Sequence, residues 1–431
     1  MTTPVQKTRG DNTCEIHVQP EVSLADRPLT SLRITNLEPH QQITLRAGTR
    51  DEAGVSWMSW GAFQSNQSGT VDLSRQSPLA GTLSKADPSA ILWSMRPQGD
   101  MTRPVPMFEK NGVMPLSIDV SVEKDGKTLG RRTLKRVFHP EEPRVTREHI
   151  DREGITGTLF HPEGRGPHPA VIILSGSGGG ISEPRAALMA AHGYAAFALA
   201  YFGVGSLPKE LHEIPVEFIE TGLSWLAEHG FVDGDRIGIC GYSKGGELAL
   251  LLGSLYPQIK AVAAFSGSAF VWQGIRFGRP SSSWTQGGQK LPCLPMKMPL
   301  STLFRLLFGK TVAFRESYER GLKASRNVEP ALIPVERIKG PIFLAAGTDD
   351  QVWPAANFAD TIVDRLKQHR HPYPCQYLKE KGAGHLVCMP YLPGAQFSRN
   401  LIFTSSDPGL NALAAIKAWD AMVGFFEEFL K

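Results

Sequence analysis

Apolar and polar residues alternate through the first third of the chain. The period of two is clear in SLRITNLEP, QQITLRAGT and SWMSWGAFQ, and it predicts strands with one buried face. The segment EKDGKT adds an Asp-Gly pair, which is typical of a tight hairpin turn. Short strands separated by turns indicate a β-sandwich, so residues 1–140 are predicted to form an immunoglobulin-like β-sandwich domain with Trp57 and Trp60 in its core.

The pattern changes after a proline-punctuated linker, HPEEPR. Buried strands are predicted from continuous apolar runs in PAVIILSGSGGG, YAAFALAYFG, RIGICGYS and GPIFLAAGTDD. Helices are predicted between them from PRAALMAAHG, VEFIETGLSWLAEHG and KGGELALLLGSLYP. Buried strands that alternate with helices indicate a mostly parallel sheet covered on both faces. The chain is therefore predicted to be an α/β protein in which residues 145–431 form a doubly wound sheet.

One segment interrupts this alternation, between about residues 270 and 338. It contains the Pro/Gly/Ser-rich stretch RFGRPSSSWTQGGQKLPCLPMKMP and precedes the last predicted strands. We interpret it as a cap-like insertion over the functional site, because long insertions at this place in such a fold commonly carry function. The alternative is a surface loop without fixed structure.

Composition and charge give no support for a nucleic-acid-binding, metal-binding or membrane-spanning protein. The 431 residues carry a net charge of +4 in dispersed positions, which gives no support for a nucleic-acid partner. The five cysteines form no spacing typical of a metal site, so neither a metal nor another cofactor is predicted. No apolar run reaches the length of a membrane span, and the N-terminus MTTPVQKTRGDNTC has no signal-peptide pattern. We predict a cytoplasmic protein and leave its oligomeric state open.

A candidate nucleophile lies in the motif Gly241-Tyr242-Ser243-Lys244-Gly245. This G-x-S-x-G pattern places a serine on a sharp strand-to-helix turn, where larger residues in place of the glycines would clash. The context agrees, because a predicted buried strand precedes the motif and a predicted helix follows it. The alternative is that Ser243 only caps that helix.

A serine hydroxyl needs a base, and the base needs an orienting acid, which follow it in the chain order serine, acid, histidine. His385 lies in the glycine-bracketed loop GAGH after a predicted strand, which is where the base belongs. His369 and His371 lie at a predicted helix end and are interpreted as exposed charges. The acid is predicted to be Asp350, with Asp349 as the alternative. The other carboxylate of the pair is expected to be a turn or cap residue.

Two backbone amides are expected to stabilise the negative charge that develops during acyl transfer. The amide of Lys244 follows the nucleophile, and the loop LSGSGGGISEP offers that of Ser177 or Gly178. The alternative for this loop is a dinucleotide-binding or phosphate-binding loop, but it lacks both the G-x-G-x-x-G spacing with a paired acid and the sequence GK[ST]. We interpret the Lys244 side chain as a solvated lysine. The alternative is that it contacts the phosphates of a ligand.

These stretches resemble one family. SGSGGGISEPRAALMAAHGYAAFALAYFG, GICGYSKGGELALLLGS, IPVERIKGPIFLAAGTDDQVWP and GAGH look like the acyl-CoA thioesterase / bile acid-CoA:amino acid N-acyltransferase family of the α/β-hydrolase superfamily. The segment LTSLRITNLEPHQQITLRAGTRDEAGVSWMSWGAF is similar to that family's N-terminal domain, so the resemblance covers about residues 14–430. It implies an acyl-CoA substrate and a triad of Ser243, Asp350 and His385.

The resemblance also implies a choice between two reactions. In the family, a serine nucleophile accompanies hydrolysis, whereas a cysteine accompanies acyl transfer to an amino acid. Cys240 lies inside the predicted strand, three residues before Ser243, so it cannot take the place of the nucleophile and a thioesterase is favoured. The alternatives are a carboxylesterase or lactone hydrolase on the same triad, an N-acyltransferase, and a binding protein that has lost its chemistry.

Overall fold

The computed structural model describes residues 13–99, 105–152, 154–164, 166–276, 280–385, 389–398 and 401–431. The chain divides into two compact units. The N-terminal unit comprises Met1–Arg103, Pro115–Val137 and Tyr391–Pro393, and the C-terminal unit comprises Pro104–Met114, Phe138–Pro390 and Gly394–Lys431. The predicted absence of a signal peptide concerns residues that lie almost wholly outside the described ranges.

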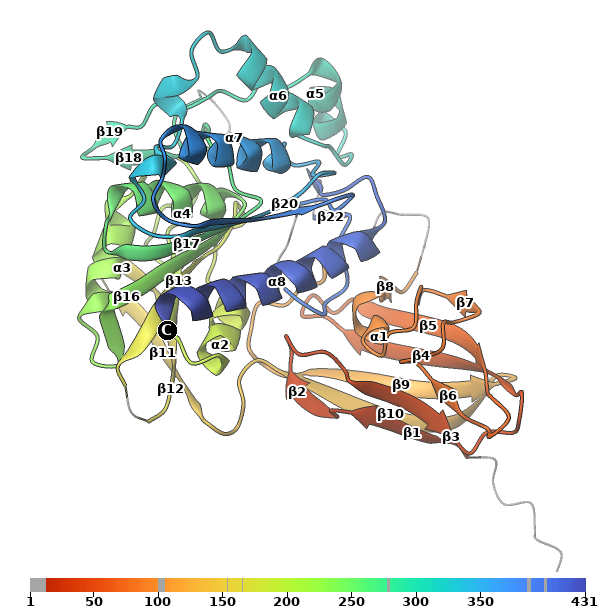
Figure 1. Cartoon of the computed structure of the whole chain (residues 1–431). Helices are drawn as coiled ribbons and strands as arrows, with labels where there is room; N and C mark the ends of the chain where they lie inside the picture. Colours follow the sequence, from red (N-terminus) through yellow and green to blue (C-terminus); the bar gives the residue numbers. More distant parts are fainter. Residues whose placement is uncertain are drawn as a thin grey trace, which may run out of the picture. The chain divides into compact units, whose positions relative to one another are not determined.

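The N-terminal unit is built from two sheets, which confirms the predicted sandwich (Figure 1). One sheet has the order β1 (Glu15–Gln19), β3 (Ser31–Thr35) and β6 (Val71–Asp72). The other has the order β2 (Val22–Leu24), β10 (Lys127–Val137), β9 (Leu116–Lys124), β4 (Gln42–Arg50), β5 (Ser56–Gln64) and β7 (Ala80–Gly81), and β8 (Arg96–Pro97) also pairs with β5.

Alternation along β5 explains why this strand has one face in the core. Trp57, Ser59 and Phe63 are buried, whereas Trp60 lies on the opposite face and is half-buried. The prediction of a core position is therefore right for Trp57 and wrong for Trp60, because the period of two sends residues three apart to different faces. A short helix, α1 (Ala90–Trp93), is buried along its whole length.

The C-terminal unit contains an eight-stranded sheet with helices on both faces. Its order is β11 (Val145–Arg152), β12 (Ile155–Pro162), β14 (Ala195–Ala200), β13 (His168–Leu174), β16 (Val232–Tyr242), β17 (Ile259–Phe265), β20 (Ile342–Gly347) and β21 (Cys375–Glu380). The six strands from β14 to β21 in this order are parallel, and β11 and β12 are antiparallel additions. The predicted doubly wound α/β fold is confirmed.

Four helices connect strands of the sheet, and a fifth, α8, follows the last strand; together they cover the sheet. They are α2 (Glu183–Ala191), α3 (Glu217–Ala227), α4 (Lys244–Leu255), α7 (Ala355–Gln368) and α8 (Pro408–Leu430). Figure 1 shows α4 and α7 over one face of the sheet and α8 over the other. Because both faces are covered, the strands are buried on both sides, and their sequences are apolar runs such as AVIIL and AAFALA.

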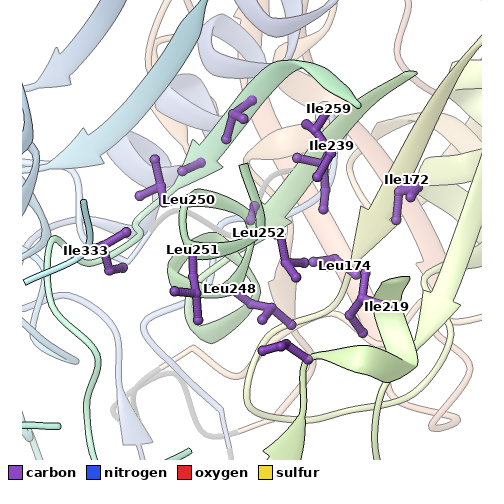
Figure 2. Packing of buried hydrophobic residues seen from close by; sticks show 14 of the residues in the cluster. Ile172, Leu174, Ile219, Ile239, Leu248, Leu250, Leu251, Leu252, Ile259 and Ile333 are labelled. Carbon is purple, nitrogen blue, oxygen red and sulfur yellow. The ribbon is translucent and has the colours of Figure 1, made fainter. Parts of the chain in front are cut away.

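The core of this unit lies between the sheet and its helices. Figure 2 shows leucines of α4 packed near isoleucines of the strands, and each labelled residue is at most 4% exposed. The labelled residues are Ile172, Leu174, Ile219, Ile239, Leu248, Leu250, Leu251, Leu252, Ile259 and Ile333. Packing of this density fixes α4, and therefore the turn at its N-terminus, against the sheet.

The insertion between β17 and β20 is folded in its described part. It contains β18 (Trp284–Gln286), β19 (Gln289–Lys290), α5 (Leu300–Leu307), α6 (Arg315–Ala324) and the 3-10 turns Glu329–Ala331 and Val335–Arg337. The short strand β15 (Ile214–Pro215) pairs with β18. Trp272 and Trp284 of the insertion are fully buried. The alternative of a structureless surface loop is therefore wrong for the described residues.

Candidate active site

Ser243 lies on the turn between β16 and α4 and has φ 57° and ψ −120°. A non-glycine residue at positive φ is strained, so the surrounding structure must hold it there. The Ser243 amide donates to the carbonyl of Phe265, at 2.8 Å, and the Ser243 carbonyl accepts from the amide of Glu247, at 3.0 Å. The Ser243 side chain makes no capping hydrogen bond. The alternative that Ser243 only caps the helix is therefore not supported.

The glycines around Ser243 have a steric reason to be glycine. A Cβ atom at Gly241 would overlap the carbonyl group of Gly245, and one at Gly245 would overlap the carbonyl oxygen of Ser175. A Cβ atom at Gly176 would lie 3.3 Å from the Cβ atom of Ser243. The turn after β16 and the loop after β13 therefore approach each other closely at the candidate nucleophile.

Asp350 and His385 lie after two neighbouring strands, β20 and β21, and their side chains contact each other. The Nδ1 atom of His385 lies 2.7 Å from Oδ2 of Asp350, and both side chains are buried. The other oxygen, Oδ1, accepts hydrogen bonds from the amides of Val352 and Trp353, at 2.8 and 3.2 Å. The carboxylate is thus held on both oxygens, which fixes the direction in which it points at the imidazole.

Trp353 connects this pair to the turn near Ser243. Its indole Nε1 donates to the carbonyl of Ser266, at 2.8 Å, and its ring packs edge-on against His385 with centroids 6.2 Å apart. Ser266 follows Phe265, the residue whose carbonyl holds the Ser243 amide. Trp353 therefore packs against the imidazole and also holds Ser266, which follows the end of β17 beside the candidate nucleophile.

The three predicted residues lie at one edge of the sheet. Ser243 follows β16, Asp350 follows β20 and His385 follows β21, and β16, β17, β20 and β21 are consecutive parallel strands. The carboxyl ends of parallel strands meet at one edge, which is where ligands bind in open α/β sheets. Ser243 is partly exposed at this edge.

Asp349, the alternative acid, holds a different part of the chain. Its carboxylate accepts from the hydroxyls of Thr404 and Ser405, at 2.6 and 2.7 Å, and from the amides of Ser405 and Ser406, at 2.8 and 2.9 Å. Burial opposes its ionisation, but these hydrogen bonds outweigh that effect and lower the pKa of Asp349 to about 2. Asp349 is therefore a turn residue, as expected for the other carboxylate of the pair.

The loop after β13 contains the two candidates for the second amide donor, Ser177 and Gly178. Both residues are exposed, and Gly176 is the residue of this loop that lies beside Ser243. The buried hydroxyl of Tyr201 donates to the carbonyls of Ser175 and Gly176, at 2.7 and 3.3 Å. Tyr201 therefore fixes the start of the loop, and the exposed Ser177 and Gly178 follow directly.

The Lys244 side chain is buried, and its prediction as a solvated lysine is wrong. Its Nζ atom lies 2.8 Å from each carboxylate oxygen of Glu247, and both side chains are at most 2% exposed. Glu247 also accepts from the indole Nε1 of Trp284, at 2.8 Å, and from the amide of Trp272, at 3.3 Å. The helix that begins at Lys244 is thus tied to the insertion through one carboxylate.

Burial opposes the charge on both partners of this pair. It raises the pKa of Glu247, against the effect of Lys244 and the tryptophan donors, and it lowers the pKa of Lys244, against the effect of Glu247. The ammonium group also lies 5.5 Å from the centroid of the Trp284 ring. The pair persists in the interior because each charge has a partner with good geometry.

Sequence analysis did not identify four residues that support the site: Tyr201, Glu247, Trp284 and Trp353. Tyr201 lies near the end of the predicted buried strand YAAFALAYFG, and Glu247 lies on the otherwise apolar buried side of the predicted helix GGELALLLG. A carboxylate inside an apolar helix was the available signal, because such a group requires a buried partner. The tryptophans gave no comparable signal in one sequence.

In the described parts of the chain, His, Cys, Asp and Glu form no group of three or more that could hold a metal ion. Within the same parts, no helix is long and apolar enough to cross a membrane.

Comparison with known proteins gives two family matches. BAAT / Acyl-CoA thioester hydrolase C terminal matches residues 214–431, and Acyl-CoA thioester hydrolase/BAAT N-terminal region matches residues 27–152. These matches confirm the resemblance found in the sequence.

Individual relatives align over most of the chain. The chain is 31% identical over 414 residues to the peroxisomal succinyl-coenzyme A thioesterase of Mus musculus and 30% identical over 416 residues to acyl-coenzyme A thioesterase 1 of Homo sapiens, and each alignment covers 94% of both proteins. One relative is thus named as peroxisomal, and the cytoplasmic location of this chain stays a prediction. Similar solved structures include a dienelactone hydrolase-like promiscuous phosphotriesterase from metagenomic libraries, with 17% identity and a TM-score of 0.43 over 67% of this chain and 99% of that one.

Proposed function

Because the chain belongs to the BAAT / acyl-CoA thioester hydrolase family, we propose that it hydrolyses acyl-CoA to a free acid and coenzyme A through a serine acyl-enzyme. The observation that carries this proposal is the buried hydrogen bond between Asp350 and His385, at the sheet edge where Ser243 occupies its strained turn. A nucleophile, a base and an orienting acid at one edge are the parts that acyl transfer needs.

The proposed reaction has two steps. In the first, the Nε2 atom of His385 accepts the proton of the Ser243 hydroxyl as its oxygen attacks the thioester carbonyl. The C–S bond of the tetrahedral intermediate then breaks, coenzyme A leaves as a thiolate, and the imidazolium gives its proton to that thiolate, which leaves His385 neutral. In the second, His385 accepts a proton from water as the water oxygen attacks the acyl-enzyme. The bond between the acyl carbon and the Ser243 oxygen then breaks, His385 returns the proton to that oxygen, and the acid is released.

Asp350 positions the base in this scheme. Its Oδ2 accepts from Nδ1 of His385, which leaves Nε2 of the neutral imidazole free to accept a proton. The two backbone donors on Oδ1 keep the carboxylate from rotating away. Burial of the pair excludes water that would weaken the interaction between the carboxylate and the imidazolium formed during the reaction.

The oxyanion of each tetrahedral intermediate is proposed to accept from the amide of Lys244 and from that of Ser177 or Gly178. The amide of Lys244 is the first of α4, so the helix N-terminus also favours negative charge there. The buried pair of Lys244 with Glu247 anchors the residue that bears this amide. Tyr201 anchors the start of the loop that carries the second donor.

Amino-acid N-acyltransfer by a cysteine is less well supported than hydrolysis. Cys240 lies within β16, is fully buried, and has its pKa raised to about 12 by that burial. A thiol in this environment is not a nucleophile. Hydrolysis of oxygen esters or lactones uses the same triad and is distinguished by substrate.

The test is release of free thiol from acyl-CoAs of short to long chain by the wild type and by Ser243→Ala. We expect thiol release by the wild type and a fall in kcat of about 10⁴ or more in the variant, by analogy with other triad knockouts. Release that survives in Ser243→Ala contradicts the proposed nucleophile. Labelling by a fluorophosphonate without any thioester turnover indicates an esterase or lactone hydrolase instead.

A further inference from the structure

Helix α5 of the insertion turns its large apolar residues toward solvent. Leu300 is 73% exposed, Phe304 58%, Leu307 71% and Phe308 74%, and Leu303 is 44% exposed. The positions 300, 303, 304 and 307 have the spacing of a single helix face. We call the five residues the α5 surface.

The opposite face of the helix contacts the protein. Thr302 is buried and Leu306 is half-buried, so the small polar residue faces inward while the larger apolar residues face outward. This is the reverse of the arrangement that burial favours in a water-exposed helix. Contiguous apolar residues that remain exposed in this way mark a surface that binds another apolar phase. In Figure 1, α5 lies in the insertion and apart from the central sheet.

The stretch of sequence that contains the α5 surface carries only basic charged residues, until Glu316 in the first turn of α6. Residues 248–315 contain eight lysines and arginines and not one aspartate or glutamate. In this region Arg276, Lys290 and Arg315 form ion pairs with carboxylates from outside that stretch. Arg305 lies in the last turn of α5, and Lys297 and Lys310 lie on either side of the helix. All three are exposed and pair with no carboxylate of the described residues. Arg305 donates to the carbonyl of Thr311 instead, at 2.9 Å.

We propose that the α5 surface is a peripheral anchor for an anionic lipid bilayer. An interfacial helix lies parallel to the bilayer with Leu and Phe side chains among the acyl chains and Lys and Arg side chains at the headgroups. The α5 surface supplies the first set, and Lys297, Arg305 and Lys310 supply the second. A second copy of the same surface is disfavoured as partner, because it would bring two basic borders together. The inference does not depend on the proposed reaction.

The test is flotation of the full chain with vesicles of phosphatidylglycerol mixed with phosphatidylcholine, and with vesicles of phosphatidylcholine alone. We expect the wild type to bind the mixed vesicles at least about tenfold more strongly than vesicles of phosphatidylcholine alone. We also expect high salt to weaken binding to the mixed vesicles. Phe304→Glu/Leu307→Glu is expected to lower binding to the mixed vesicles by about tenfold or more, because both side chains leave the acyl region.

A second variant separates the two parts of the anchor. Lys297→Gln/Arg305→Gln/Lys310→Gln keeps the apolar face, so we expect it to lose the preference for anionic vesicles. The matched control is Leu79→Glu/Met114→Glu, which changes two apolar residues of similar exposure, 62% and 75%, elsewhere in the chain. This control is expected to bind like the wild type.

Three outcomes of the vesicle experiments overturn the proposal. They are failure of the wild type to bind mixed vesicles, equal binding by the wild type and Phe304→Glu/Leu307→Glu, and equal losses in that variant and in the control. Concentration-dependent dimerisation that is abolished by Phe304→Glu/Leu307→Glu, without vesicle binding, assigns the surface to a second copy and also overturns it. Because the altered residues are exposed, thermal unfolding is expected to show all variants folded.

Discussion

Two adjacent carboxylates show how strongly the surroundings of a residue determine its role. Asp350 is fully buried against His385, whereas Asp349 holds the turn at Thr404–Ser406. We expect Asp350→Asn to lower kcat by about 10⁴, because an amide no longer enforces the productive imidazole tautomer. Asp349→Asn is expected to retain most of the turnover. Thiol-release kinetics of the two variants distinguish the roles, and equal losses of kcat contradict the assignment.

The contribution of Asp349 to stability depends on pH in a defined direction. A carboxyl whose pKa is lowered in the folded state stabilises the protein above its ordinary pKa, and that stabilisation disappears as pH falls through the folded-state value. We expect Asp349→Asn to lower the free energy of unfolding by about 1–3 kcal/mol at neutral pH. The difference should shrink between pH 3.8 and about 2. Urea unfolding across this range tests it, and a difference that grows with acidity would contradict it.

The buried pair of Lys244 and Glu247 can be tested by a double-mutant cycle. Lys244→Met leaves the Glu247 carboxylate buried without its cation, which we expect to cost about 3–5 kcal/mol of unfolding free energy. Lys244→Met/Glu247→Leu removes both charges, so we expect it to be more stable than Lys244→Met. Urea unfolding of the wild type, both single variants and the double variant gives the coupling free energy between Lys244 and Glu247. Additive losses would show that the two charges do not stabilise each other.

At the scale of elements, the turn between β16 and α4 depends on backbone contact that only glycine allows. We expect Gly245→Ala to lower both the thermal midpoint and kcat, because the added methyl group overlaps the Ser175 carbonyl and displaces the turn from the loop after β13. Gly424→Ala is the matched control, since Gly424 lies in α8 with open space at its Cβ position.

The control should be neutral or gain up to about 1 kcal/mol of unfolding free energy from higher helix propensity. Circular dichroism melts and thiol-release assays measure both variants. A Gly245→Ala variant with wild-type turnover would show that the turn tolerates a side chain.

Periodicity was sufficient to predict most elements of both units. The apolar runs predicted to be strands form β13, β14, β16 and β20. The Asp-Gly pair forms a hairpin turn, with φ 49° at Asp125 and 76° at Gly126. These predictions held because each depends on residues close together in the chain. The motif around Ser243 was equally local, and the structure gives it the expected strand before and helix after.

Long-range partners could not be predicted in the same way. Lys244 was interpreted as solvated because nothing nearby in the sequence shows that Trp284 of the insertion closes over Glu247. The same limit applies to Trp353, whose bond to Ser266 joins residues far apart in the chain. Burial of a polar group is decided by tertiary packing, which one sequence does not contain.

At the scale of the whole molecule, each unit is assembled from separate segments of chain. Pro104–Met114 belongs to the C-terminal unit although residues of the N-terminal unit precede and follow it. The backbone amide of Gln396 donates to the carbonyl of Val105, at 2.8 Å. The backbone amide of Val105 donates to the side-chain oxygen Oε1 of Gln396, at 3.1 Å. The C-terminal unit therefore needs a short segment encoded inside the sequence of the other unit.

This segment supports the loop that holds the candidate acid. Met107 packs against a small buried cluster of Val352, Ala395 and Phe403, and the amide of Val352 is one of the two donors to Asp350. The carbonyl of Phe403 accepts from the amide of His385, at 2.9 Å. Disturbing Met107 therefore disturbs the supports of both members of the pair.

We therefore expect Met107→Asp to lower the unfolding free energy by about 1–3 kcal/mol and to reduce kcat more than it raises KM, because a charge at the cluster loosens the acid and base together. Met114→Asp is the matched control in the same segment, since Met114 is 75% exposed and its substitution should change stability by less than about 0.5 kcal/mol. Urea unfolding and steady-state thiol release give both quantities. Equal behaviour of the two variants would show that the segment is only a connection, whereas the expected difference would make it a structural part of the site.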